Sequence, residues 1–328
     1  MNPDAQLLTQ LRETAESGIS GADLAQKLGV TRATVLAHIR LLRTHGYEIE
    51  SSPHTGYQLE RSPDLLHSDD LFSRLGKVRV IGRDIRVFRE TTSTNDVLEK
   101  LASAGVQEGS VVFAEAQTAG RGRLGRKWLS PPYRGLWFSV LLRPDLRPLE
   151  TTRLTILAAT ALARASRLET NLMPQIKWPN DLLLDGRKVA GILTELRAEI
   201  DRVKHVIIGI GVDVNLTSNE FPAELRKTAT SIRIESGAKA DRAALAAAIL
   251  RELDADYHRL RLGRFEAIAD EWEKLCTTLG RAVTIRLGPR TIQGVAESLD
   301  NDGALLIRTQ HGRLERVTGG DVTVESHR

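Results

Sequence analysis

The sequence predicts a multidomain α+β protein with an N-terminal winged helix-turn-helix, a central mixed α/β domain and a small C-terminal β-barrel. Three observations support this prediction: a helix, glycine turn and helix pattern near the start, alternating strand-like and helical runs in the middle, and short strands after Gly280. A chain of 328 residues is long enough for two or three such domains. We place the domains at residues 1–62, 63–275 and 276–328.

The N-terminal segment has the spacing of a helix-turn-helix. Apolar residues 7, 8 and 11 fall on one face of a first helix, and residues 23–28 form a second. Gly29 supplies the turn, and Thr31 caps a helix that continues to Leu42. Two helices joined by a glycine turn make a helix-turn-helix. Residues 47–50 and 54–59 read as a hairpin and therefore as its wing.

The charges of this segment indicate a local positive face. Between Leu24 and Tyr47 there are four Lys or Arg residues and no Asp or Glu. A helix that enters a DNA groove needs such a face. Winged helices also serve as protein-interaction modules, and that alternative stays open. The DNA contacts we expect come from the helix that begins near Thr31 and from the wing: Thr31, Arg32, Thr34, His38, Thr55 and Gly56.

The central segment alternates strands and helices after a polar stretch, Arg61–Asp70, which reads as a linker. We expect strands at Val78–Arg89, Val111–Ala116, Leu136–Leu142 and Val206–Val214, and helices at Asn95–Ala104, Glu150–Leu168 and Asp241–Leu262. Leu182–Leu184 and Val189–Leu196 flank Asp185-Gly186, a dipeptide suited to a tight hairpin turn. Such mixing predicts one sheet with helices packed on it.

The last segment is a run of short strands: Ala282–Leu287, Thr291–Ala296, Ala304–Arg308, Leu314–Val317 and Val322–Val324. Turn residues such as Asn301-Asp302-Gly303 separate them. A small β-barrel is the simplest closure for so few residues.

Composition limits the class of protein. A hydrophobic content of 41% and a charged content of 27% are those of an ordinary soluble globular protein. The single cysteine, Cys276, cannot form an internal disulfide, which suits a reducing compartment. No apolar run approaches the ~20 residues of a membrane span, and no signal-peptide core is present. We therefore expect a cytoplasmic protein without a membrane partner, and no histidine or cysteine spacing predicts a metal site.

One loop, Gln117–Trp128, combines glycines with cations. From Ala116 to Pro144 there are six Lys or Arg residues and no Asp or Glu, which predicts an anionic ligand. The glycines fit G-x-G-x-x-G, but Pro131-Pro132 forbids the helix that a dinucleotide site needs. A solvated basic loop without function is the remaining alternative.

Three further segments accompany this loop: Thr92–Asn95, Lys177–Asp181 and Arg187–Leu193. Together with Gly120–Arg123 they resemble, in order, the four signatures of biotin protein ligases, and Gly209–Asn215 and Ala229–Ile232 fit as well. With a helix-turn-helix in front, the whole chain is similar to the bifunctional biotin protein ligase and biotin operon repressor (BirA) family. It departs at Leu124, where a further arginine can follow Arg123 in this family.

The resemblance implies a fold and an activity. The central domain would be biotin/lipoate ligase-like and the barrel SH3-like. The enzyme would join biotin to ATP as biotinyl-5'-AMP, with Mg²⁺ arriving on the ATP, and transfer biotin to a lysine of a biotin carboxyl-carrier protein. As a homodimer carrying adenylate, it would bind operator DNA of biotin-synthesis genes. Two alternatives stay open, a monofunctional ligase and a biotin-sensing repressor whose catalysis has decayed.

The resemblance also assigns the candidate site residues. Arg123 and Lys188 would be catalytic by stabilising the reacting anions. The residues expected at biotin are Ser93, Thr94, Asn95, Gln117, Arg121, Gly122, Arg123 and Lys188. Those expected at ATP or the adenylate are Gly120, Arg121, Arg123, Trp128, Lys177, Asn180, Asp181 and Asn215. Helix capping at residues 93–95, a solvated Lys188 and core packing of Trp128 are the plainer alternatives.

Overall fold

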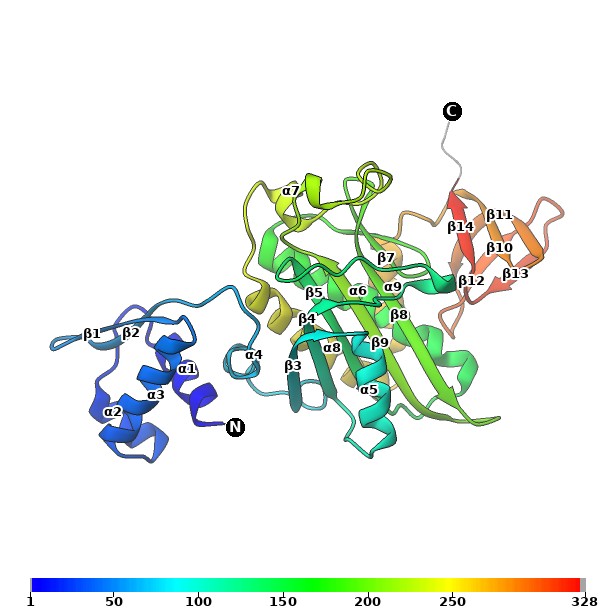
Figure 1. Ribbon diagram of the computed structural model, residues 1–328. Coiled ribbons are helices and arrows are strands. Elements are labelled where there is room, and N and C mark those ends of the chain that lie inside the picture. The colour runs from blue at the N-terminus through cyan, green and yellow to red at the C-terminus, as the bar shows by residue number, and fades with distance from the viewer. Residues whose placement is uncertain (1, 325–328) are drawn as a thin grey trace. The chain divides into compact units, whose positions relative to one another are not determined.

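The computed structural model describes residues 2–324 and divides the chain into two compact units (Figure 1). The first comprises Met1–Lys77 with Asp241–Ala247, and the second comprises Val78–Ala240 with Ala248–Arg328. The division into three domains stays a prediction.

The first unit is a winged helix-turn-helix, as predicted. Its elements are α1 (Pro3–Glu13), α2 (Gly21–Leu28), α3 (Arg32–Thr44), β1 (Glu48–Ser52), β2 (Gly56–Arg61) and α4 (Ser68–Leu75). Thr31 caps α3 by accepting a hydrogen bond from the Thr34 amide, and Gly29 ends α2 in the left-handed conformation. Leu8, Leu24 and Ile39 are fully buried in the core that these helices share.

Helix α4 corrects the expected linker at Arg61–Asp70, because its first turn already begins at Ser68. Leu71 and Leu75 on this helix are buried, and the buried Asp70 bonds the guanidinium groups of Arg12 and Arg74. The polar composition of this stretch did not predict a helix, because the buried acid is paired only in the folded unit. A buried carboxylate needs such partners.

The second unit is built on a seven-stranded sheet in the order β3-β4-β5-β9-β8-β7-β6. Only the β3–β4 pair is parallel. The strands are β3 (Asp84–Thr91), β4 (Ser110–Gln117), β5 (Gly135–Leu142), β6 (Gln175–Lys177), β7 (Asp181–Leu184), β8 (Arg187–Ala198) and β9 (Val203–Asp213). All eight residues of β5 are buried, which fits a central strand covered on both faces.

Helices cover both faces of this sheet (Figure 1). Helix α5 (Thr94–Ser103) packs on β4, β5 and β9, while α6 (Thr152–Thr170) packs on the other face and α9 (Phe265–Leu275) packs on α6. Helix α8 (Arg242–Arg261) begins in the first unit and continues into the second from Ala248. Helix α9 and the short α7 (Ile232–Ser236) were not predicted from the sequence. The short helices η1 (Arg123–Gly125), η2 (Pro148–Thr151) and η3 (Ser218–Glu220) lie in loops.

The expected strand at Val78–Arg89 is only partly correct, because β3 begins at Asp84. The amides of Arg79, Val80 and Ile81 donate to the buried carboxylate of Asp254, at 2.8, 2.8 and 2.9 Å, instead of to a neighbouring strand. A side chain remote in sequence therefore replaces the sheet ladder.

The C-terminal segment is a five-stranded antiparallel sheet in the order β13-β12-β11-β10-β14. Its strands are β10 (Ala282–Leu287), β11 (Arg290–Leu299), β12 (Leu305–Arg308), β13 (Leu314–Val317) and β14 (Asp321–Val324). The multidomain α+β fold class is thus confirmed, whereas closure of this sheet into an SH3-like barrel stays a prediction. No helix of the described chain is long and apolar enough to cross a membrane.

Candidate active site

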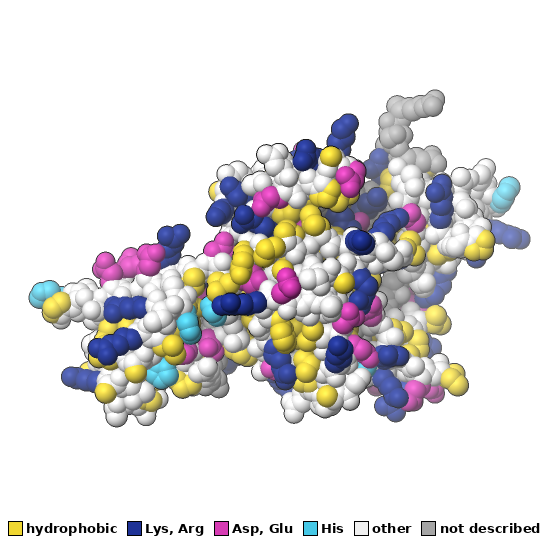
Figure 2. Space-filling view, viewed as in Figure 1, with side chains coloured by type: hydrophobic (Ala, Val, Ile, Leu, Met, Phe, Trp, Pro, Cys, Tyr) yellow, Lys and Arg dark blue, Asp and Glu magenta, His cyan; other side chains and the backbone are white. Residues whose placement is uncertain are grey.

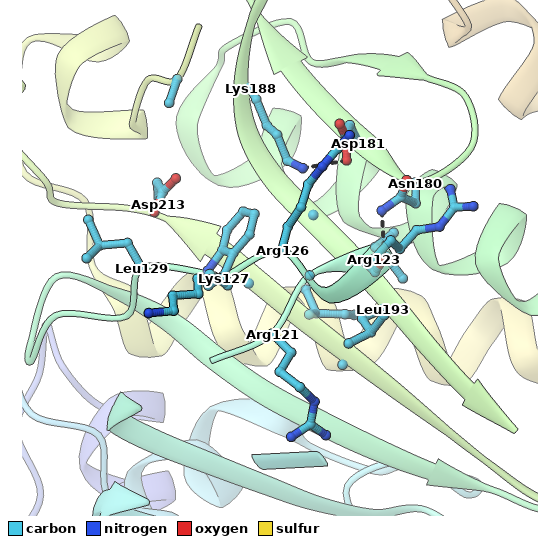
Figure 3. Close-up of a pocket in the computed structure, with 18 of the residues that line it drawn as sticks. Arg121, Arg123, Arg126, Lys127, Leu129, Asn180, Asp181, Lys188, Leu193 and Asp213 are labelled. Carbon is cyan, nitrogen blue, oxygen red and sulfur yellow. Dashed lines mark hydrogen bonds and ion pairs between the residues drawn. The ribbon is translucent and has the colours of Figure 1, made fainter. Parts of the chain in front are cut away.

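A cavity of about 510 Å³ lies on the α5 side of the seven-stranded sheet (Figure 3). It brings together residues from all four motifs, although the motifs are spread over roughly a hundred positions of the sequence, about the length of a small domain. The predicted ligand residues that line it are Ser93, Thr94, Asn95, Gln117, Arg121, Gly122, Arg123, Trp128, Lys177, Asn180, Asp181 and Lys188. A volume of this size suits a small-molecule ligand.

A hydrogen-bonded polar group forms one end of the cavity, at the start of α5. Gln117 Oε1 accepts from the amide and the hydroxyl of Thr94, at 2.8 and 3.2 Å. The Ser139 hydroxyl donates to Asn95 Oδ1 at 2.5 Å, and Asn95 Nδ2 donates to Glu195 at 2.7 Å. Ser93 occupies the N-cap position but makes no side-chain capping bond. Capping therefore does not use this hydroxyl, which lines the cavity.

Glycines form a flat floor next to this group. Gly191 of β8 and Gly211 of β9 stand directly opposite each other, and the indole of Trp128 lies on them. A Cβ at Gly211 would sit 2.5 Å from Trp128 Nε1, and one at Gly209 would sit 2.4 Å from Asn95 Oδ1. The floor thus requires glycine. Within the described residues, the buried Trp128 N–H has no hydrogen-bond acceptor.

Lys188 lies above this floor, between an aromatic ring and an acid. Its Nζ is 5.1 Å from the Trp128 ring centroid and 2.6 Å from Asp181 Oδ1 (Figure 3). The cation is therefore fixed over the cavity rather than free at the hairpin surface. Asp213, two residues beyond Gly211 on the same face of β9, also lines the cavity. Burial raises the pKa of its carboxyl well above the ordinary value, and Lys188 opposes this shift.

The glycine-arginine loop crosses the cavity in a fixed turn. The Gly122 amide donates to the Arg126 carbonyl at 2.7 Å, and the Trp128 amide donates to the Gly120 carbonyl at 2.9 Å. Leu124, at the tip, has a φ of 57° and is 68% exposed. A leucine in the left-handed region is strained, and elsewhere in the loop Gly125 takes that conformation without cost.

The two predicted loop arginines have different partners. Arg121 makes a bidentate ion pair with Asp96, at 2.6 and 2.8 Å, and contacts Glu195 at 3.3 Å. The Asp96 carboxylate, followed by Glu195, raises the pKa of Arg121. Arg123 instead donates to the neutral Asn180 side chain at 3.1 Å, and burial lowers its pKa. The Arg121 guanidinium thus lies at the carboxylates of α5 and β8 on the edge of the cavity, and its expected ligand contact stays a prediction (Figure 3).

Two predicted residues do not line the cavity. Gly120 packs against the other end of its own loop, where a Cβ would sit 2.6 Å from the Trp128 carbonyl oxygen. The Asn215 amide both donates to and accepts from the backbone of Ala240, at 3.0 Å each. The Asn215 side chain is buried and already bonds the backbone, and its expected nucleotide contact stays a prediction.

Several lining residues are not among those predicted from the sequence. The apolar wall includes Phe138, Leu183, Ile192 and Leu193, and the charged rim includes Arg126, Lys127, Lys227 and Asp321. Gly209 and Gly211 could have been predicted, because glycines two apart on a strand share a face. On the face of the second unit shown in Figure 2, Lys and Arg side chains surround hydrophobic ones below α7. An amphipathic anion fits this combination.

The winged helix presents the predicted DNA residues unevenly. Arg32 and Thr31 are exposed at the start of α3, and Thr55 is exposed at the wing. His38, however, lies with Nδ1 2.6 Å from Asp4 Oδ1 in α1. Gly56 packs on the backbone, since a Cβ there would sit 2.2 Å from the Ile19 carbonyl oxygen. The structure thus engages His38 and Gly56 in the domain's own packing.

Comparisons with known proteins cover almost the whole chain. Residues 87–213 match the model of the biotin/lipoate A/B protein ligase family, residues 4–58 match an HTH domain, and residues 278–324 match the biotin protein ligase C-terminal domain. The chain is similar to the biotin protein ligase of Aquifex aeolicus, which was solved in complex with biotin and ATP. The two are 30% identical with a TM-score of 0.64, and the match covers 75% of this chain and 100% of that one.

Two curated relatives are similar from end to end. The bifunctional ligase/repressor BirA of Bacillus subtilis (strain 168) is 37% identical over 96% of this chain and 97% of its own length. That of Escherichia coli (strain K12) is 31% identical over 94% and 93%. The chain therefore belongs to the bifunctional ligase/repressor family of biotin protein ligases.

Proposed function

We propose that this protein is an ATP-dependent biotin protein ligase that also represses transcription in response to biotin. The observation that carries the ligase assignment is the cavity itself, in which a polar end, a glycine floor and a cationic rim meet. Biotin would place its ureido group among Ser93, Thr94 and Asn95, which offer both donors and acceptors. Its carboxylate would then lie toward the cations.

The first step joins two anions. A carboxylate oxygen of biotin attacks the α-phosphorus of Mg-ATP, and pyrophosphate leaves. Lys188 and Arg123 are placed to stabilise the negative charge that develops, since both cations line the same cavity. Lys177, Asn180 and Asp181 would hold the nucleotide and the magnesium that arrives with it. Closure of the loop over the product would exclude water from the mixed anhydride.

The second step transfers the acyl group. The amine of an acceptor lysine on a biotin carboxyl-carrier protein attacks the acyl carbon, and AMP departs. The intact cations at Arg123, Lys177 and Lys188 argue against a repressor with decayed catalysis. Biotin-dependent exchange of labelled pyrophosphate into ATP tests the first step directly. Exchange that does not depend on biotin, or its absence with correctly folded protein, would refute the ligase assignment.

The winged helix carries the repressor assignment. Helix α3 offers Arg32 near its N-terminal end, the part of a recognition helix that reaches base edges. A single winged helix reads a short site, so we propose that two adenylate-bound chains bind a two-fold-symmetric operator as a homodimer. Adenylate would favour the dimer by ordering loops next to a sheet edge.

Binding to DNA upstream of biotin-synthesis genes tests this assignment at fixed salt. We expect binding to tighten when biotin and ATP are both added, and Arg32→Ala to weaken it without changing pyrophosphate exchange. Equal binding with and without the ligands would remove the adenylate switch. Absence of sequence-specific binding in both conditions would leave the monofunctional ligase.

A further inference from the structure

A second hollow, of about 290 Å³, adjoins the cavity. Its walls come from η2 and the start of α6, from β8, and from the segment before β14. Five threonines line it: Thr151, Thr152, Thr155, Thr194 and Thr318. Leu149, which is 65% exposed, and Leu196, which is 40% exposed, also line it. We call this hollow the threonine groove.

The threonine groove meets the cavity at Arg123 and Asn180. These two residues, with Pro179 and Ile192, line both spaces. The Arg123 side chain donates to Asn180 at 3.1 Å, and Asn180 is itself fixed because its Nδ2 donates to the Ile192 carbonyl at 2.8 Å. Gly319 leaves room for the guanidinium, since a Cβ there would sit 2.8 Å from Arg123 Nη2. The hydrogen bond between Arg123 and Asn180 therefore lies where the cavity and the threonine groove join.

The two spaces differ in charge. The cavity carries several cations besides Arg123, including Lys177, Lys188 and Lys227. Among the described residues that line the threonine groove, Arg123 is the only charged one. Phosphates and carboxylates are favoured on the cationic side. The groove, with a single cation at its end and otherwise uncharged walls, suits an uncharged reactant.

Resting on the proposed ligase function, we propose that the threonine groove admits the acceptor lysine to the adenylate and holds its side chain as the neutral amine. The aliphatic stem would lie along the threonine methyl groups and leucines, and the threonine hydroxyls can bond the backbone of the acceptor loop. Arg123 disfavours a second cation next to it and so favours the unprotonated amine. The occupant is thus the lysine-bearing loop of a carrier protein.

The neutral form is what the transfer needs. The lone pair of the lysine Nζ attacks the acyl carbon, a C–N bond forms, and the bond from that carbon to the phosphate oxygen breaks. AMP takes the bonding electrons, and the amine proton passes to its phosphate. A protonated ammonium has no lone pair, so any group that stabilises it slows the step.

Carboxylates on the surrounding elements are already paired. Glu150 of η2 bonds Arg153 at 3.2 Å, and Arg153 also bonds Asp302 of the C-terminal sheet at 3.2 Å. Glu195 of β8 contacts Arg121 at 3.3 Å. Nearer to Arg123, Asp181 bonds Lys188 at 2.6 Å and Asp321 bonds Arg126 at 2.7 Å. These pairs reduce the pull of the neighbouring negative charges that would hold the incoming lysine as an ammonium ion.

The first test separates docking from chemistry. The double variant Leu149→Gln, Leu196→Gln should raise KM for a biotin carboxyl-carrier domain by about tenfold, because two apolar contacts are lost. Pyrophosphate exchange, measured without acceptor, should be unchanged. Leu168→Gln, at an equally exposed leucine of 65% near the other end of α6, is the matched control. An unchanged acceptor KM, or a raised KM for ATP, would overturn the assignment.

The second test uses the charge of the groove. Thr152→Asp is compatible with the fold because an acid is favourable in the first turn of α6. Its carboxylate should hold the lysine as ammonium and move the pH profile of transfer to higher pH by on the order of one unit, whereas Thr152→Asn should not. Superimposable profiles for the two variants would refute the neutral-amine role. Absence of adenylate in the parent would refute the ligase function instead.

Discussion

Gly211→Ala tests whether the loop must close on the glycine floor. The new methyl group would lie 2.5 Å from Trp128 Nε1 and 2.6 Å from Cε2. Non-bonded carbon atoms prefer separations of about 3.5–4.0 Å, so the indole has to rise by roughly an ångström. Because Trp128 belongs to the loop, the loop rises with it, while β9 stays in the sheet.

The magnitude follows from the cost of overpacking. Inserting a methyl group into a filled contact costs about 1–3 kcal/mol. If the closed loop is the state that makes and retains adenylate, that cost should appear as about a 5- to 150-fold loss in single-turnover adenylate formation or retention, at 1.4 kcal/mol per factor of ten. The melting temperature should change little, because an exposed loop can lift without opening the core.

The assay is a double-mutant cycle with Trp128→Ala. In that background the indole is gone, so Gly211→Ala should cost much less than in the parent, and the difference is the coupling between the two positions. Rates are measured with saturating biotin and Mg-ATP, with thermal unfolding alongside. An equal loss in both backgrounds would refute the reasoning, since the methyl group would then act through something other than Trp128.

Three further predictions concern single side chains. Lys188→Ala should lower the rate of adenylate formation by about 10²–10³-fold, the usual effect of losing one preorganised charge, with little change in melting temperature; a core-sized stability loss with intact chemistry would reverse the assignment. Asp254→Ala leaves three buried amides without their acceptor and should lower the free energy of unfolding by at least about 3 kcal/mol in urea titrations, whereas a surface-like change below about 0.5 kcal/mol would show that another group binds them. Burial raises the native pKa of Asp213, so between the ordinary carboxyl pKa and the raised one the native state binds more protons than the unfolded state, and the parent loses stability as pH rises through that window. Asp213→Asn lacks this group and should therefore gain stability relative to the parent over the same pH range. A stability difference that does not change with pH would contradict this prediction.

Much of the fold was predictable because local signals and burial agree. Thr31 and Gly29 mark the helix boundaries of the winged helix as their chemistry requires. The failures have long-range causes. The segment before β3 looked like a strand, but its amides bond Asp254, far along the chain. The first turn of α4 looked like the end of a linker because its buried acid finds Arg12 only in the folded unit. Local pattern cannot report such partners.

In the candidate site too, the sequence predicts the type of residue present but not the partner that each residue has in the fold. Arg121 and Arg123 both follow a glycine in one loop, so the sequence makes them equivalent. In the structure Arg121 is paired with two carboxylates at a partly exposed position. The more buried Arg123 hydrogen-bonds the neutral Asn180 and feels the carboxylates of Asp181 and Asp321 only at longer range. An incoming anion gains more from a desolvated cation that lacks a counter-ion than from one already paired. We therefore expect the stronger ligand interaction at Arg123, whereas Arg121 joins the loop to Asp96 of α5.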